Sequence, residues 1–443
     1  MTTFLDRLII TGLAVALVFT ALAHGAVEGW SVAFFEWTVA SLFLLWGLRL
    51  GISGRVLVSI PGVVLPMVGL LAFAAIQGLN LPGNGEHATL SIDSEATHQA
   101  VAVLFFLVVA YLIAANFLCS PDRLRALATF LVFYGLAMSV FALIQHFTWN
   151  GKFYWLFPTR AMGAFGPFVN RNHFAGYLEM LMPIPIGLLI SRGVDDQKII
   201  YGFAAAIMGV AILATESRGA LLAIICEMIF IAVVDRRISR ARRTWSPAAS
   251  TSRAPRLVVR LGAVGMVSIA ILAGVLWIGA DPIIGRVAGS GGANDAAPDP
   301  GYSRQAIWQG TIAMIKAHPL MGVGFGAYET AYPIYAVTDG TVIVAQSHND
   351  YLQILADCGV VGGALALWFL VIVTRTTIRA LAARDRFLSG LAAGAGAGIL
   401  GLLVHSIVDF NLQLPSNALL FLVILAVVSV IARTNHTKEL QRI

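Results

Sequence analysis

The stretch LIITGLAVALVFTALAH (residues 8–24) contains no charged side chain and follows directly after Arg7. An uncharged apolar run of about 20 residues can cross the ~30 Å hydrocarbon core of a membrane as a helix. The composition fits many such runs: 58% of the residues are hydrophobic and 12% are charged. Soluble globular chains contain roughly 25% charged residues. The sequence therefore predicts an all-α polytopic membrane protein.

About twelve apolar runs are long enough to be membrane spans. They cover residues 8–24, 30–48, 57–79, 99–118, 124–146, 173–190, 198–214, 219–234, 257–279, 362–380, 388–406 and 415–432. We expect residues 1–443 to form a single integral membrane domain.

The basic residues predict the orientation of these spans. Most of the 29 Lys and Arg residues fall on the connections that share a side with Arg7, including the cluster RRISRARR (236–243). A positive excess marks the cytoplasmic side. We therefore expect both termini in the cytoplasm and a basic cytoplasmic loop at 235–256. The same distribution argues against a nucleic-acid partner despite the net charge of +6.

The opposite side receives the longest connection, residues 280–361. Its segment YSRQAIWQGTIAMIKAHP (302–319) has apolar positions at helical spacing and predicts an amphipathic helix on the membrane surface. The segment SHNDYLQILADCGVVGG (347–363) predicts the start of another helix. Ser347 or Asn349 can cap this helix, and Gly359 can end it.

Some polar residues near the predicted membrane boundary are candidates for function. Arg218 lies on a very short outer turn, where an arginine is costly unless it is paired or lies in a wet cavity, so function is the first hypothesis. The alternative is that Arg218 pairs with Glu216 or extends its side chain to the lipid headgroups. His405 and Asp409 stand at i and i+4, which predicts one helical face and an imidazole–carboxylate pair. No further ligands complete a metal shell around them.

Four segments, in this order, carry a family resemblance: AFGPFVNRNHFAGYLEMLMPI (164–184), ESRGALLAI (216–224), SRQAIWQG followed by HPLMGVGFGAYE (303–329), and SHNDYLQILADCGVVGG (347–363). Together they resemble the bacterial O-antigen ligase and O-antigen polymerase superfamily over roughly residues 100–415. The resemblance implies a GT-C-type glycosyltransferase fold in the bacterial inner membrane, with an active site that faces the periplasm. It does not separate ligase from polymerase.

The resemblance also implies a chemistry. Such enzymes move a glycan from undecaprenyl diphosphate to an acceptor hydroxyl, by direct displacement with inversion at the anomeric carbon. His348 matches the family's histidine and would act as the base, while Arg218 and Arg304 match its functional arginines. Guanidinium groups suit a leaving diphosphate, and imidazole suits a base near neutral pH. No metal or other cofactor is expected.

Further residues are predicted to bind substrate or support the site: Arg171, Arg160, Asn349, Tyr351, His405 and Asp409. Two of them have equally plain structural alternatives. Arg171 can anchor its loop, with Asn170, Asn172 and His173 as a polar cluster at the helix start, and Tyr351 can serve in packing.

Competing functions remain at this point. A transporter or flippase for a polyprenyl-linked sugar should carry ionisable residues near the midplane and show repeated halves with broken helices. The apolar runs are nearly free of charge, with Glu227 as an exception, and no internal repeat is evident. We therefore favour an enzyme with chemistry at the outer surface. Because the predicted outer region is compact and contains no added soluble domain, we expect its acceptor to be lipid A core. A polymerase that joins lipid-linked glycans is the alternative, and a protein hydroxyl is a third acceptor.

Overall fold

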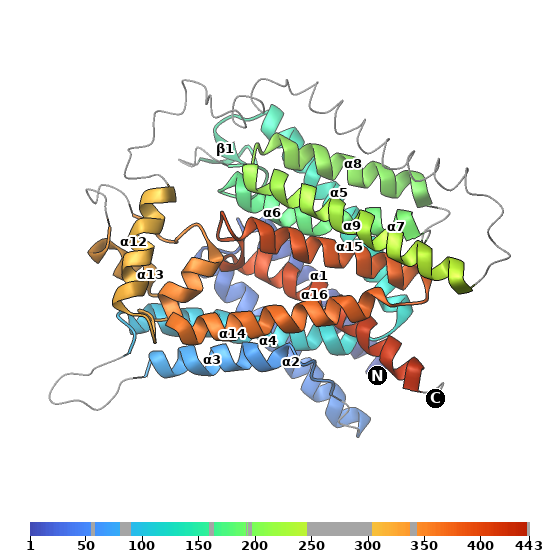
Figure 1. Ribbon diagram of the computed structural model, residues 1–443, viewed down its shortest axis with the longest axis horizontal. Helices are drawn as coiled ribbons and strands as arrows, with labels where there is room; N and C mark the ends of the chain where they lie inside the picture. Colours follow the sequence, from blue (N-terminus) through green and yellow to red (C-terminus); the bar gives the residue numbers. More distant parts are fainter. Residues whose placement is uncertain are drawn as a thin grey trace.

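The computed structural model of the protein describes residues 1–54, 58–79, 90–158, 164–191, 193, 197–245, 304–336 and 343–440. This part of the chain is almost entirely helical (Figure 1). Its helices are α1 (Thr2–Leu22), α2 (Gly29–Ser53), α3 (Val64–Gln77), α4 (Ser94–Phe117), α5 (Pro121–Phe147), α6 (Arg171–Leu181), α7 (Pro183–Ser191), α8 (Lys198–Ala214), α9 (Arg218–Trp245), α12 (Arg304–Ala317), α13 (Tyr328–Ala331), η4 (Tyr332–Ile334), α14 (Asp350–Leu381), α15 (Arg386–His405), η5 (Asn411–Gln413) and α16 (Pro415–Leu440). A two-stranded hairpin pairs β1 (Lys152–Phe153) with β2 (Phe157–Pro158).

The prediction of an all-α polytopic membrane protein is confirmed. Among the described residues, 8 helical segments are long and apolar enough to cross a membrane, and α3 and α8 are shorter apolar helices. Every predicted span overlaps a helix, apart from residues 257–279, which lie outside the described residues. The span 173–190 is divided between α6 and α7. In lipid the helix is favoured because it satisfies every backbone hydrogen bond within one segment.

The core of the bundle is built from α6, α7, α15 and α16. The apolar window of α16 is 100% buried, whereas that of α2 is 28% buried and faces outward. Glycines let α7 and α15 approach closely: a Cβ on Gly187 would lie 2.4 Å from the carbonyl oxygen of Gly390. Small residues at such crossings are the usual means of close helix packing in membranes.

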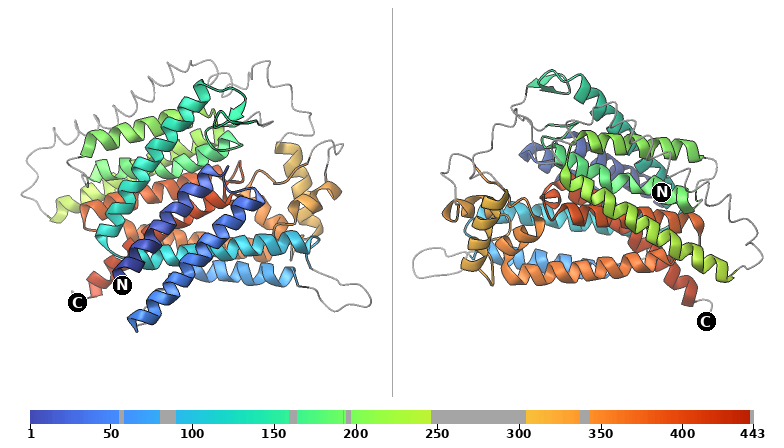
Figure 2. Two further views of the ribbon diagram at one scale, coloured as in Figure 1. Left: turned by 180° about the vertical axis from the view of Figure 1, so that it is seen from behind. Right: turned by 45° about the horizontal axis from the view of Figure 1, so that its top comes forward.

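The two ends of the bundle differ in character. Both termini lie at one end, and α12 and α13 lie at the other (Figures 1 and 2). At the terminal end the Asp6 carboxylate bridges α1, α2 and α5, with Arg49 Nε at 3.0 Å and Arg123 Nη2 at 2.6 Å. Termini on one side agree with an even number of spans.

The predicted surface helix exists as α12, and it lies across the end of the bundle, transverse to the long helices (Figure 1). Its apolar face packs on protein: Ile307 is 2% exposed and Met314 is 0% exposed in a small core with Tyr328 and Tyr332. We expected this apolar face to meet lipid. Ile312, another apolar residue of the helix, is exposed and faces away from the small core. α12 and its neighbours thus form a cap on this end.

The Gly-x-Gly-x-Gly segment (residues 322–326) connects this cap to α14. Val323 N donates to Ala356 O at 2.9 Å, and Gly324 N donates to Asp357 O at 3.0 Å. Gln77, at the end of α3, donates through Nε2 to Asp357 O at 3.0 Å and accepts from Phe325 N at 3.1 Å. Gly322 is required by close contact with the backbone of Asp357, whereas a Cβ on Gly324 would meet the Ser91 side chain and one on Gly326 would meet the Ala100 Cβ.

Gly322→Ala should lower the thermal midpoint in detergent by an amount that corresponds to about 1–3 kcal/mol. Gly322 has φ +72°, and a Cβ there would lie 2.3 Å from the carbonyl of Asp357. Gly54→Ala is the matched control, because Gly54 has φ +60° with nothing within 4 Å. Equal losses in both variants would mean that the backbone contact contributes nothing.

Candidate active site

A buried carboxylate organises the end of the bundle beneath the cap. Asp409 follows α15, and three cationic or basic side chains surround it. His173 Nε2 lies 3.4 Å and His348 Nδ1 lies 3.6 Å from its Oδ1, while Arg304 Nη2 lies 3.6 Å from its Oδ2. These residues come from α6, from the start of α14 and from α12, so the site joins three distant parts of the sequence.

Exposure increases from the centre of this cluster outward. The Asp409 side chain is 0% exposed and that of His173 is 7% exposed, but His348 is 31% and Arg304 is 42% exposed. The carboxylate therefore lies at the bottom, and an imidazole and a guanidinium lead from it toward the surface. Phe410 packs edge-on against both imidazole rings, at centroid distances of 4.5 Å for His173 and 4.8 Å for His348.

The pKa of Asp409 follows from these neighbours. Burial acts to raise the pKa of Asp409, but the imidazoles of His173 and His348 outweigh it and hold the pKa well below its ordinary value. The carboxylate therefore stays charged at physiological pH.

The backbone around His348 explains its position. Asn349 caps α14, because its Oδ1 accepts from Tyr351 N and Leu352 N, both at 3.0 Å. Of the two predicted caps, the structure uses Asn349. The predicted end of this helix is also found, since Gly359 interrupts α14 with φ +58°. His348 itself has φ +52°, a left-handed conformation that costs a non-glycine residue of order 1 kcal/mol.

Asp350 locks this segment to the turn that carries Asp409. Its carboxylate accepts from Ser406 Oγ at 2.7 Å, from Leu412 N at 3.2 Å and from Gln413 Nε2 at 3.3 Å. Its backbone N donates to Ser406 O at 2.9 Å. His348 and Asp409 are consequently held together from both sides, and Asp350 is a functional candidate that the sequence patterns did not single out.

Three predicted arginines share an unusual position. Arg171, Arg218 and Arg304 are each the first residue of a helix, α6, α9 and α12 respectively. Cations are unfavourable at helix N-termini, where backbone N–H groups and the helix dipole attract anions. Arg171 Nη1 pairs with Glu216 Oε2 at 3.5 Å, so the alternative pairing of Arg218 with Glu216 is not what the structure has. Arg218 is exposed, and the described part of the chain gives it no ion-pair partner.

The remaining predicted residues play other parts. Tyr351 donates its hydroxyl to Leu403 O at 2.7 Å and thereby ties α14 to α15. Arg160 lies outside the described residues. The prediction that His405 and Asp409 share a helical face is wrong, because α15 ends at His405 and a turn precedes Asp409.

His405 instead pairs with a residue that the sequence patterns missed. Its Nδ1 lies 3.0 Å from Glu179 Oε2 and 3.1 Å from Oε1, and both side chains are almost fully buried. His173 was noticed only as part of a polar helix start. The sequence contains the same signal for Glu179 and for His173: each is a polar side chain within or beside an apolar run.

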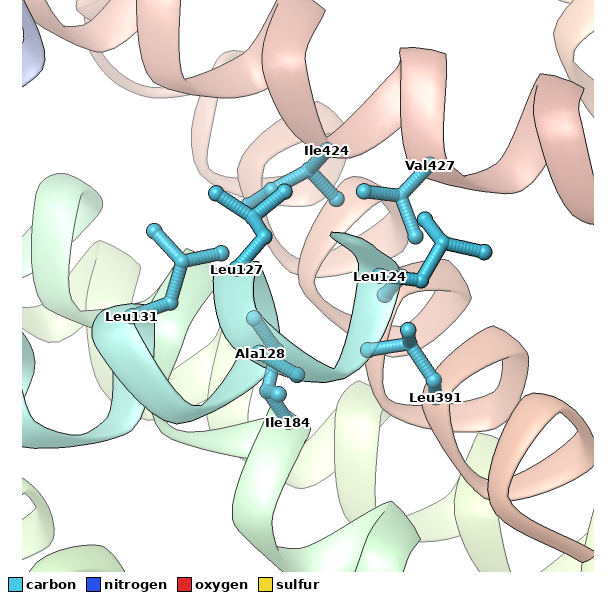
Figure 3. Close-up of a pocket in the computed structure, with 9 residues that line it drawn as sticks. Leu124, Leu127, Ala128, Leu131, Ile184, Leu391, Ile424 and Val427 are labelled. Carbon is cyan, nitrogen blue, oxygen red and sulfur yellow. The ribbon is translucent and has the colours of Figure 1, made fainter. Parts of the chain in front are cut away.

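Among the described residues, neither a metal centre nor an apolar cavity competes with this site. The described residues contain no group of His, Cys, Asp and Glu side chains that could hold a metal ion. Figure 3 shows a hollow between α5, α7, α15 and α16 that is lined by apolar side chains, such as Leu124, Leu391 and Val427. It has no polar side chain to carry out chemistry.

The fold and the cluster define a class: a polytopic helical membrane protein with an imidazole–carboxylate–guanidinium site at one end of the bundle. Residues 203–367 match the family model described as O-antigen ligase. The match confirms the predicted resemblance to the O-antigen ligase superfamily and supports an O-antigen ligase or polymerase type of function. The matched stretch includes Arg218, Arg304 and His348. The curated proteins gave no match.

Proposed function

We propose that the protein is an O-antigen ligase-type glycosyltransferase of the bacterial inner membrane. It moves a glycan from undecaprenyl diphosphate to a hydroxyl of lipid A core at the periplasmic face. The observation that carries this proposal is the Asp409 cluster, in which His348 and Arg304 reach outward from one buried carboxylate. A base for the acceptor and a cation for the leaving group are thus held side by side.

The reaction is a single displacement. The acceptor oxygen attacks the anomeric carbon, its bond to the diphosphate oxygen breaks, and the configuration inverts. Because Nδ1 of His348 faces Asp409, Nε2 is left to take the proton of the acceptor hydroxyl. The charged Asp409 then stabilises the imidazolium that forms.

The diphosphate leaves with additional negative charge, which needs positive charge held in place beforehand. Arg218 and Arg304 supply it, and Arg171 stands at a neighbouring helix start. An arginine at the first helical position is unfavourable without an anion. With a bound diphosphate, the guanidinium and the helix N-terminus attract the same group.

One experiment tests the donor and the acceptor together. Protein in lipid nanodiscs receives undecaprenyl-diphosphate glycan and lipid A core, and mass spectrometry identifies the glycosylated product. We expect glycosylated lipid A core. Longer glycans on the lipid carrier would instead make the protein a polymerase, and absence of both products would refute the proposed function.

Arg218→Ala should weaken binding of undecaprenyl diphosphate by roughly tenfold or more, because a charge-assisted phosphate contact is lost. Arg375→Ala is the control, because Arg375 is an exposed arginine near the end of α14 that is remote from His348. Binding is measured on the purified variants in nanodiscs. Unchanged affinity in Arg218→Ala would remove this arginine from the mechanism.

A further inference from the structure

A second buried polar group lies behind the site and is not used by the proposed chemistry. His405 and Glu179 form a short pair, at 3.0 Å between Nδ1 and Oε2. The other ring nitrogen, Nε2, lies 3.5 Å from Ser217 Oγ. The side chains of His405 and Glu179 are 1% and 0% exposed, so neither is placed to touch a substrate.

The imidazole ring of His405 lies directly on the first turn of α9. A Cβ on Gly219 would lie 2.5 Å from its Cδ2 and 2.6 Å from its Nε2, so only glycine fits there. Ser217 and Gly219 thus both contact His405, and the residue between them is Arg218. Its side chain is exposed, while its two neighbours in the chain are buried.

The residues that precede α9 are also held by a contact with α6. Glu216 has a left-handed backbone, with φ +54°, and its carboxylate pairs with Arg171. A residue with this conformation persists where its surroundings fix it. The start of α9 is therefore clamped between the first turn of α6 and the end of α15, with Arg218 as the residue left to project.

We propose that Glu179 and His405 are positioning residues for Arg218: they set the start of α9 and hence the place where its guanidinium meets the diphosphate. This inference rests on the proposed function. A buried carboxylate must keep its partner, because an unpaired one is costly. The pair therefore favours one arrangement of α6, α15 and α9, and a displacement of about 1 Å at a phosphate contact can cost up to 10²-fold.

The test is a double-mutant cycle on binding of undecaprenyl diphosphate, with undecaprenyl monophosphate as the comparison lipid. Glu179→Gln should weaken diphosphate binding by roughly tenfold in the wild-type background and have no further effect in Arg218→Ala. Asp6→Asn is the matched control: it also removes the charge of a buried, paired carboxylate, but at the opposite end of the bundle, where Asp6 pairs with Arg49 and Arg123. It should bind like wild type.

Gly219→Ala provides a second variant that leaves the buried pair intact and displaces only the first turn of α9. It should weaken binding in the same direction and likewise add nothing to Arg218→Ala. Equal losses with and without Arg218, or equal losses in Asp6→Asn, would overturn the positioning role. If Arg218→Ala weakens binding but Glu179→Gln and Gly219→Ala do not, the inference fails while the proposed function stands. If wild type binds no diphosphate lipid, both fail.

Discussion

The His348→Ala variant is expected to transfer glycan about 10³-fold more slowly than wild type, while binding the donor normally. In the proposed mechanism the Nε2 of this imidazole faces the acceptor, and its Nδ1 lies 3.6 Å from Asp409. Because the side chain is 31% exposed, its removal should cost little stability. Single-turnover transfer in nanodiscs measures the chemical step, and donor binding is measured separately on the same preparation.

His318→Ala is the matched control for this prediction. His318 belongs to the same cap and is also partly buried, with its Nε2 2.9 Å from the Tyr335 hydroxyl. It contacts none of the Asp409 cluster, so transfer should be unaffected. Transfer by His348→Ala within tenfold of wild type would exclude His348 as the base, and a matching loss in His318→Ala would point to damage of the cap instead.

The membrane spans could be predicted because an uncharged run of sufficient length has essentially one solution in lipid. The predicted run 388–406 also located α15. Its exact end could not be predicted, because it depends on a tertiary contact: Ser406 binds both the backbone and the carboxylate of Asp350. That contact ends α15 before Asp409, so that Asp409 does not share a helical face with His405.

The site was predicted in part. The sequence indicated His348, Arg304 and Asp409 as candidates, and the structure brings these three together. The sequence did not indicate that Asp409 is the centre of the site, because its partners come from helices far apart in the chain. His173 was hidden in the same way, since it joins the cluster only once α6 packs against the turn after α15.

The Gly-x-Gly-x-Gly segment illustrates the opposite difficulty. Such a motif has more than one physical use, and a sequence cannot say which contact demands the glycines. Here the backbone of Asp357 lies against Gly322, and the Ser91 side chain lies 2.0 Å from where a Cβ of Gly324 would be. The motif therefore docks the cap that carries Arg304, and it serves the site indirectly.

Asp409→Asn should have the second large effect, a loss of transfer of about a hundredfold or more. The amide keeps the volume of the carboxyl but removes the charge that, in the proposed mechanism, stabilises an imidazolium on His348. It also offers an N–H to ring nitrogens that faced an acceptor, which favours the wrong tautomer. Asp385→Asn is the control, because Asp385 only caps α15, where an amide serves equally well.

The dependence of stability on pH is an independent test of whether Asp409 is charged in the folded protein. Because the pKa of Asp409 is lower in the folded protein than its ordinary value, its contribution to stability is present above pH ~3.9. It is lost only as the pH falls below that value toward the lowered pKa. Wild type should therefore have a higher thermal midpoint than Asp409→Asn at neutral pH, and the difference should shrink only in strong acid. A difference that vanishes near neutral pH would mean that Asp409 is not held ionised by its neighbours, and the base would then lack its counter-charge.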